Sequence, residues 1–216
     1  MKAVEGTNAW IDVELAAWRS DSELRTRVKL HLDAHPAAML ILSSHFFDGA
    51  TASLADSVEE ALREGPQVVA KVAYTSTHIT DSFPALDLMQ RFGPRVVAIC
   101  MGEAGTWTRV LARKLGAFAT FASLDKAAST APGQWSVEEL RENFGWDRID
   151  AGTRVFGVAG DPIAHSLSPR LFNHWFKQHN SNAVFVPLRI GTDHGGLANF
   201  LVEAQRRRWL NVSGLS

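Results

Sequence analysis

Two side chains in the first half of the sequence could act on a carbonyl compound. Lys71 lies within the otherwise apolar residues 68–73, where loss of solvent favours the neutral form of an amine. A neutral amine is a nucleophile that can form a Schiff base with a ketone or aldehyde. His45 ends the preceding apolar run and could transfer protons near neutral pH. The alternatives are a lysine whose amine reaches water and a histidine that is only a polar residue at the rim.

A cation follows the next apolar run along the chain. Arg109 comes just after the glycine-bearing residues 101–105, and a guanidinium can hold a carboxylate by two parallel hydrogen bonds. A solvated helix arginine is the plainer interpretation of that position. If these runs are parallel strands, their carboxyl ends lie on one side, so the three side chains could share a site.

Two further segments carry polar groups suited to an oxygen-rich ligand. Thr130 and Gln134 belong to a turn that offers a hydroxyl and an amide. Ser166 and Ser168 precede Pro169 at a predicted helix start, where free backbone N–H groups suit a carboxylate. Ser168 could instead serve only as the cap of that helix.

Short apolar runs must position these groups, and each of the first four is followed by a helical pattern. The runs occupy residues 9–15, 37–43, 68–74, 95–101 and 117–122. Runs that are apolar on both faces are typical of buried parallel strands, and their alternation with helices predicts βα units. No G-x-G-x-x-G motif follows any of the five runs. We therefore expect units of a (β/α)₈ barrel rather than a doubly wound dinucleotide-binding sheet.

Local signals mark helix starts and a boundary between two regions. Ser20 with Glu23, and Ser136 with Glu139, have the spacing of capping boxes. The polar, glycine-containing residues 145–153 indicate a linker. After it we expect a second region with strands at 154–159, at 183–189 and near 209–213, and with helices from Ser168 and from about Asp193.

Composition narrows the classes of protein that this chain could represent. The 216 residues carry a formal net charge of −1, are 46% hydrophobic and include a single cysteine, Cys100. This composition favours a globular cytoplasmic protein and gives no reason to expect a nucleic-acid or membrane partner. No run approaches the roughly 18 apolar residues of a membrane-spanning helix. We also find no cluster of residues at metal-ligand spacing and expect no metal.

The first region resembles type I 3-dehydroquinate dehydratases over roughly residues 8–144. The resemblance rests on Asp12-Val13-Glu14-Leu15, His45, Ala70-Lys71-Val72-Ala73, the stretch from Gly105 to Arg109, and Ala131-Pro132-Gly133-Gln134. It implies a partial (β/α)₈ barrel of about five units, which dehydrates 3-dehydroquinate to 3-dehydroshikimate without a cofactor.

The same resemblance implies a role for each candidate residue. Lys71 would form the imine, His45 would move protons, and Arg109 would bind the substrate carboxylate. Thr130 and Gln134 would close over the substrate. The family has an aspartate directly after the histidine, where this chain has Phe46.

The second region resembles the start of shikimate dehydrogenases. The resemblance covers residues 158–169, which read Val-Ala-Gly-Asp-Pro-Ile-Ala-His-Ser-Leu-Ser-Pro, and a strand within residues 209–216. It implies that Ser166 and Ser168 hold the carboxylate of shikimate or dehydroshikimate. That family uses NADP, and we expect its nicotinamide-binding half, with the catalytic lysine and aspartate, to be missing here.

Joined in this order, the two regions resemble bifunctional 3-dehydroquinate dehydratase/shikimate dehydrogenases, which catalyse consecutive steps of the shikimate pathway. We expect a dehydratase unit at residues 1–148, a linker at 149–153 and a substrate-binding unit at 154–216, with both units incomplete. Two alternatives remain open. The chain could be a truncated product without activity, or another Schiff-base barrel enzyme of the aldolase type.

Overall fold

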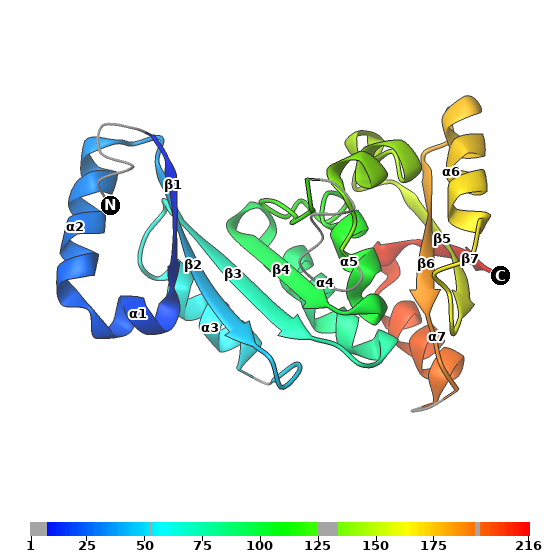
Figure 1. Cartoon of the computed structure of the whole chain (residues 1–216), viewed down its shortest axis with the longest axis horizontal. Helices are drawn as coiled ribbons and strands as arrows, with labels where there is room; N and C mark the ends of the chain where they lie inside the picture. The colour runs from blue at the N-terminus through cyan, green and yellow to red at the C-terminus, as the bar shows by residue number, and fades with distance from the viewer. Residues whose placement is uncertain (1–7, 52, 125–133, 193–194) are drawn as a thin grey trace.

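The computed structural model of the chain describes residues 8–51, 53–124, 134–192 and 195–216. Two parallel sheets lie side by side along the long axis of the molecule, one of four strands and one of three (Figure 1). The fold is therefore α/β with parallel sheets, as the alternation of apolar runs and helical patterns predicts.

The first sheet is built from four consecutive strands that pair in sequence order, all parallel. Its strands are β1 (Trp10–Glu14), β2 (Met39–Phe46), β3 (Val68–Thr75) and β4 (Val96–Met101). The associated helices are α1 (Leu15–Ser20), α2 (Ser22–Ala34), α3 (Leu54–Leu62), α4 (Phe83–Phe92) and α5 (Thr106–Leu111). Each of the first four predicted runs thus becomes a strand, with its end shifted by a few residues at most.

The two faces of this sheet bury different side chains. Leu40, Leu42 and Tyr74 belong to the large core beneath the helices. On the opposite face, a smaller buried cluster consists of Ile41, Val69, Ala73, Val97 and Ile99. Because side chains alternate along a strand, Lys71 lies on this second face, between two members of the smaller cluster. We call it the inner face.

The fifth predicted strand, at residues 117–122, is not formed, so the expectation of five strands was wrong. The segment donates one backbone hydrogen bond from Phe118 to Val96 at the start of β4 and then leaves the sheet edge. Phe118 instead packs against the inner-face cluster, with its ring centroid 4.8 Å from that of Trp10 on β1. Covering this apolar face replaces the backbone pairing that a fifth strand would have made.

The two predicted capping boxes have different outcomes. Ser136 and Glu139 form the reciprocal pair, with the Glu139 N–H donating to Ser136 and the Ser136 N–H donating to Glu139. The box at Ser20 was wrong, because Ser20 ends α1. Asp21 caps α2 instead, and its carboxylate accepts from the Leu24 N–H at 2.8 Å.

The second sheet has the order β6-β5-β7 and is also parallel. Its elements are β5 (Arg154–Gly160), α6 (Ser168–Gln178), β6 (Ala183–Arg189), α7 (Gly196–Arg206) and β7 (Val212–Leu215). The first two strands match the expected bounds closely. The last strand begins later than expected, because residues 208–210 form a single 3₁₀ turn.

The two sheets are joined by packed side chains as well as by the chain itself. Phe200 of α7 is fully buried, with ring centroids 5.7 Å from both Phe83 of α4 and Trp107 of α5. Beside this cluster, the Arg207 guanidinium donates two hydrogen bonds of 2.6 Å to the Asp87 carboxylate. Segments far apart in sequence therefore share one core.

The segment expected to be a linker is held in place by hydrogen bonds. Arg113 and Lys114 donate to the backbone oxygens of Ile149 and Ala151. Asp150 in turn accepts from Asn182, just before β6.

Among the described helices, none combines the length and the apolar character needed to cross a bilayer.

Candidate active site

Five polar side chains gather on the inner face of the first sheet, on three neighbouring strands. Asp12 and Glu14 lie two residues apart on β1, Ser43 and His45 do so on β2, and Lys71 lies on β3. The strand register places Glu14 opposite Ser43, and Ser43 opposite Lys71. His45 lies one step further towards the carboxyl ends of the strands. The parallel pairing thus converts residues distant in sequence into one polar row beside the apolar cluster.

Lys71 has a charged partner that its apolar strand did not reveal. Its Nζ donates to the Asp12 Oδ2 at 2.8 Å, and it lies 4.7 Å from the centre of the Phe121 ring. The lysine side chain is only 11% exposed. The structure therefore presents an ion pair in a partly desolvated place, rather than the isolated amine suggested by the sequence pattern.

His45 also contacts a carboxylate of β1. Its Nδ1 lies 2.5 Å from the Glu14 Oε1, and its ring stacks near Phe47 with centroids 6.2 Å apart. The following residue, Phe46, packs against the large core on the other face. No acidic residue directly follows His45 in this chain. The carboxylate beside His45 therefore comes from Glu14 on the neighbouring strand.

Ser43 links the two pairs through space. Its hydroxyl donates to the Asp12 Oδ1 at 2.6 Å and lies 3.5 Å from the Glu14 Oε1. A hydroxyl has one proton to donate, and 3.5 Å is at the limit of hydrogen bonding. The serine therefore belongs with Asp12 and Lys71, and Glu14 is left to His45.

Arg109 is apart from this row. It is 4% exposed, and its described hydrogen bond runs from Nη1 to the Cys100 carbonyl oxygen at 3.3 Å. Its Nε finds no partner among the described residues, and burial lowers the pKa of the guanidinium. No contact between described residues joins it to Lys71 or His45. The structure thus confines a cation near the end of β4 whose Nε has no hydrogen-bond partner among the described residues.

The remaining predicted site residues lie away from this row or outside the described residues. Thr130 is outside the described residues, and Gln134, the first residue after that gap, is half-buried. Ser166 and Ser168 belong to the second sheet, at the turn before α6. The Ser168 backbone N–H donates to the Ser166 hydroxyl at 3.4 Å, so Ser168 is the first helical residue and not the cap.

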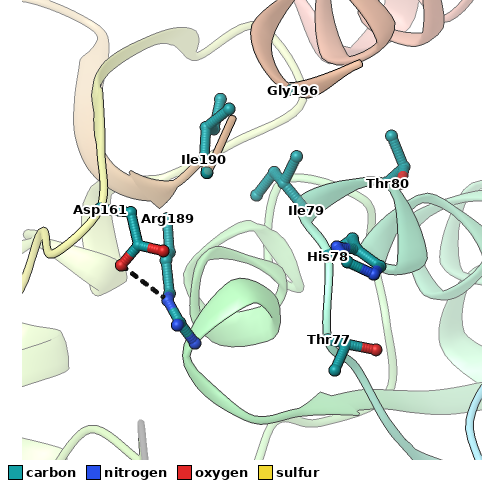
Figure 2. Close-up of a pocket in the computed structure, with 9 residues that line it drawn as sticks. Thr77, His78, Ile79, Thr80, Asp161, Arg189, Ile190 and Gly196 are labelled. Carbon is teal, nitrogen blue, oxygen red and sulfur yellow. Dashed lines mark hydrogen bonds and ion pairs between the residues drawn. The ribbon is translucent and has the colours of Figure 1, made fainter. Parts of the chain in front are cut away.

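A small pocket lies where the carboxyl ends of strands from both sheets approach each other (Figure 2). It has a volume of about 50 Å³, and its walls include Thr77, His78 and Arg189. The Arg189 Nε lies 3.1 Å from Asp161 and 3.6 Å from Glu103. Two carboxylates therefore already neutralise its cation, and the space suits little more than water.

Across the described ranges, no three His, Cys, Asp or Glu side chains are arranged to hold a metal ion.

The structure brings Lys71 and His45 to neighbouring strands, and it adds Asp12, Glu14 and Ser43, which the sequence analysis did not include among the candidate site residues. A signal for the two acids was present. They alternate with Ile11 and Val13, so both must share one face of a strand, and that face is the one that carries Lys71.

Comparison with known proteins identifies both parts of the chain. A model of "Type I 3-dehydroquinase" matches residues 1–151, and one of "Shikimate dehydrogenase substrate binding domain" matches residues 158–216. The chain is 32% identical over 154 residues to the chloroplastic bifunctional 3-dehydroquinate dehydratase/shikimate dehydrogenase of Arabidopsis thaliana, covering 70% of this chain and 25% of that protein.

Single-function relatives match the first part. The 3-dehydroquinate dehydratase of Methanococcus maripaludis strain C7 is 34% identical over 142 residues, or 65% of this chain and 62% of that protein. The crystal structure of the Geobacillus kaustophilus 3-dehydroquinate dehydratase is similar, with a TM-score of 0.51, 27% identity, and coverage of 62% of this chain and 51% of that one. The chain thus spans less than two thirds of each of these relatives. It belongs to the type I 3-dehydroquinase family, in a fusion whose residues 158–216 match a shikimate dehydrogenase substrate-binding domain.

Proposed function

We propose that this chain is a lyase that dehydrates 3-dehydroquinate to 3-dehydroshikimate through a Schiff base on Lys71. The observation that carries the proposal is the pairing of a partly desolvated lysine with a histidine on the neighbouring strand, each next to its own carboxylate. Membership of the type I 3-dehydroquinase family supports the same assignment.

The chemistry follows from what an imine does to its neighbours. The Lys71 amine attacks the substrate ketone, and water leaves as the carbon–nitrogen double bond forms. The cationic imine withdraws electrons, so a proton on the adjacent carbon can be removed by a base. The electron pair then forms a carbon–carbon double bond as the hydroxyl one carbon further leaves with a proton, and water hydrolyses the imine to free the lysine. His45 is the proton-transfer group within reach of this row.

Arg109 is proposed to bind the substrate carboxylate. Supporting this role, its guanidinium is buried, its Nε is unpartnered and it has no carboxylate partner among the described residues. An uncompensated buried cation is costly, and a bidentate carboxylate would offset that cost. Thr130 and Gln134 are proposed to close over the substrate, as in the family that the chain resembles.

We further propose how the chain is divided and what the second part binds. The dehydratase unit occupies residues 1–148 as part of a (β/α)₈ barrel, the linker 149–153, and the substrate-binding unit 154–216. Ser166 and Ser168, at the start of the eleven-residue helix α6, would hold the carboxylate of shikimate or dehydroshikimate. Shikimate dehydrogenases use NADP, but the turn after β5 reads Gly160-Asp161-Pro162 and is not glycine-rich.

The proposal is tested by turnover of 3-dehydroquinate, followed by the ultraviolet absorbance of the conjugated ketone product. Lys71→Ala should reduce the rate to background. Lys29→Ala, which removes an exposed lysine paired with Glu64, should leave the rate unchanged. Absence of turnover by the unaltered chain, or undiminished turnover by Lys71→Ala, would contradict the proposal.

A further inference from the structure

We infer that Phe200 is a positioning residue for the dehydratase reaction, because it holds α5 against β4 and thereby fixes the guanidinium of Arg109. Phe200 lies within the residues that match a shikimate dehydrogenase substrate-binding domain, whereas Arg109 lies within those that match a type I 3-dehydroquinase. The inference rests on the proposed function, in which Arg109 binds the substrate carboxylate.

Helix α5 is too short to hold its own place. It has six residues, Thr106–Leu111, and no described side chain caps its first turn. A helix of fewer than two turns contributes little stability of its own, so its position depends on what packs around it. All six of its residues are buried. The neighbours of α5 therefore decide where Arg109 lies.

One side of α5 is fixed by the carboxyl end of β4. Arg109 donates from Nη1 to the Cys100 carbonyl oxygen at 3.3 Å. Gly105, directly before the helix, lies so close to the same carbonyl group that a Cβ atom there would overlap with it. The fully buried Thr108 hydroxyl donates to the Gly105 carbonyl oxygen at 2.7 Å. The turn and the helix are thus joined to each other and seated on the strand end.

The opposite side of α5 is fixed by α7. Successive residues of an α-helix are about 100° apart around its axis, so Trp107 and Arg109 project about 200° apart, in nearly opposite directions. Trp107 is fully buried, and its ring centroid lies 5.7 Å from that of Phe200. Its indole N–H donates to the Ser82 hydroxyl at 2.9 Å. Phe200 therefore packs on the side of α5 that faces away from Arg109, and it keeps the arginine against β4.

The other reacting groups are held by different contacts. Lys71 on β3 pairs with Asp12, and His45 on β2 pairs with Glu14, so both are held by carboxylates of β1. Loss of the Phe200 ring should therefore weaken the binding of the substrate carboxylate without impairing imine formation or proton transfer.

Steady-state kinetics of folded variants test this separation. Phe200→Ala should raise the KM for 3-dehydroquinate about 10-fold and leave kcat nearly unchanged, because one charge-assisted hydrogen bond of the guanidinium is misplaced. Phe176→Ala is the matched control and should leave KM unchanged. It removes a buried ring of α6 whose ring contacts are with Phe156, Phe172 and Trp175.

A milder variant keeps the test decisive if Phe200→Ala does not fold. Phe200→Leu retains an apolar side chain and should show the same rise in KM, at smaller size, with kcat unchanged. A rise in KM that is equal in the Phe200 and Phe176 variants would reflect lost stability alone and would overturn the inference. So would an unchanged KM in the Phe200 variant that folds.

A double-mutant cycle tests whether Phe200 acts through Arg109. In an Arg109→Met background, Phe200→Ala or Phe200→Leu should have no further effect on KM, since the group that the phenylalanine positions is gone. Additive effects of the two substitutions would contradict a positioning role.

Side-chain NMR of the arginines supplies a readout that does not need turnover. The Arg109 Nε–H is buried, so its signal, assigned with Arg109→Met, should exchange slowly with water. Exchange should be about 10-fold faster in the folded Phe200 variant, because α5 opens more easily, and unchanged in Phe176→Ala. Equal exchange in all these chains would overturn the inference. If the unaltered chain does not turn over, the proposed function fails, while this measurement still decides whether Phe200 positions the arginine.

Discussion

Arg109 is a buried cation for which the described residues provide one backbone acceptor, 3.3 Å away. A cation in this setting contributes little to stability, because its desolvation is poorly compensated. Burial lowers the pKa of this arginine, but a guanidinium begins so high that it stays charged at neutral pH. We therefore expect Arg109 to contribute to the binding of an anion rather than to the stability of the fold.

We predict that Arg109→Met raises the KM for 3-dehydroquinate about 10²-fold, since a charge-assisted hydrogen bond contributes about 1.5–3 kcal/mol and a bidentate contact has two. The free energy of unfolding should change by less than about 1 kcal/mol or increase. Steady-state kinetics and urea unfolding measure the two quantities. Arg91→Met, at an exposed pair with Glu59, is the matched control. An unchanged KM would exclude Arg109 from substrate binding.

For single residues, the sequence predicts which side chains are candidates for catalysis better than it predicts which side chains they contact. Lys71 and His45 stand out because a polar residue interrupts or ends an apolar run. Asp12 and Glu14 become their partners because β1 pairs with β2. No local sequence pattern predicts that pairing. The orientation of Arg109 towards Cys100 depends on how α5 packs on β4 and could not be read from spacing.

The strands and helices themselves were largely predictable. Four of five expected strands of the first sheet form, and so do all three of the second. The failure at residues 117–122 has a physical cause. Its apolar side chains Phe118 and Phe121 cover the inner face of the sheet. A local apolar pattern cannot distinguish a segment that covers a sheet in this way from a strand buried within it.

The start of α2 gives an element-scale prediction. Asp21→Ala should reduce the free energy of unfolding by about 1 kcal/mol, because the Leu24 N–H loses its acceptor. Ser20→Ala should cost less, because Ser20 ends α1 and its hydroxyl is exposed. Urea unfolding of the two variants decides between them. A larger loss of stability for Ser20→Ala would instead support the capping box that the spacing of Ser20 and Glu23 predicts.

The two sheets and their helices are packed against each other through side-chain contacts. Phe200 of α7 packs between Phe83 of α4 and Trp107 of α5, and the Arg207–Asp87 pair lies beside them. The Arg207 side chain is 17% exposed and its charge is shared with Glu203. Hydrogen bonding to Asp87 raises the pKa of Arg207.

We predict that Phe200→Ala destabilises the two sheets and their helices together, by about 3–5 kcal/mol, as expected for a large buried side chain. Leu197→Ala, at an exposed position of the same helix, should cost far less. Hydrogen exchange reports the location of the loss. Protection should fall in α4 and α5 as well as in α7. A loss confined to residues 154–216 would show that the two sheets are stable independently of each other.

The proposed reaction depends on a Schiff base between Lys71 and 3-dehydroquinate. The most direct measurement is reduction with borohydride in the presence of that compound, followed by peptide mapping by mass spectrometry. We expect one stable adduct, located on Lys71, which is abolished in Lys71→Ala and retained in Lys29→Ala. An adduct on another lysine, or none on the unaltered chain, would contradict it.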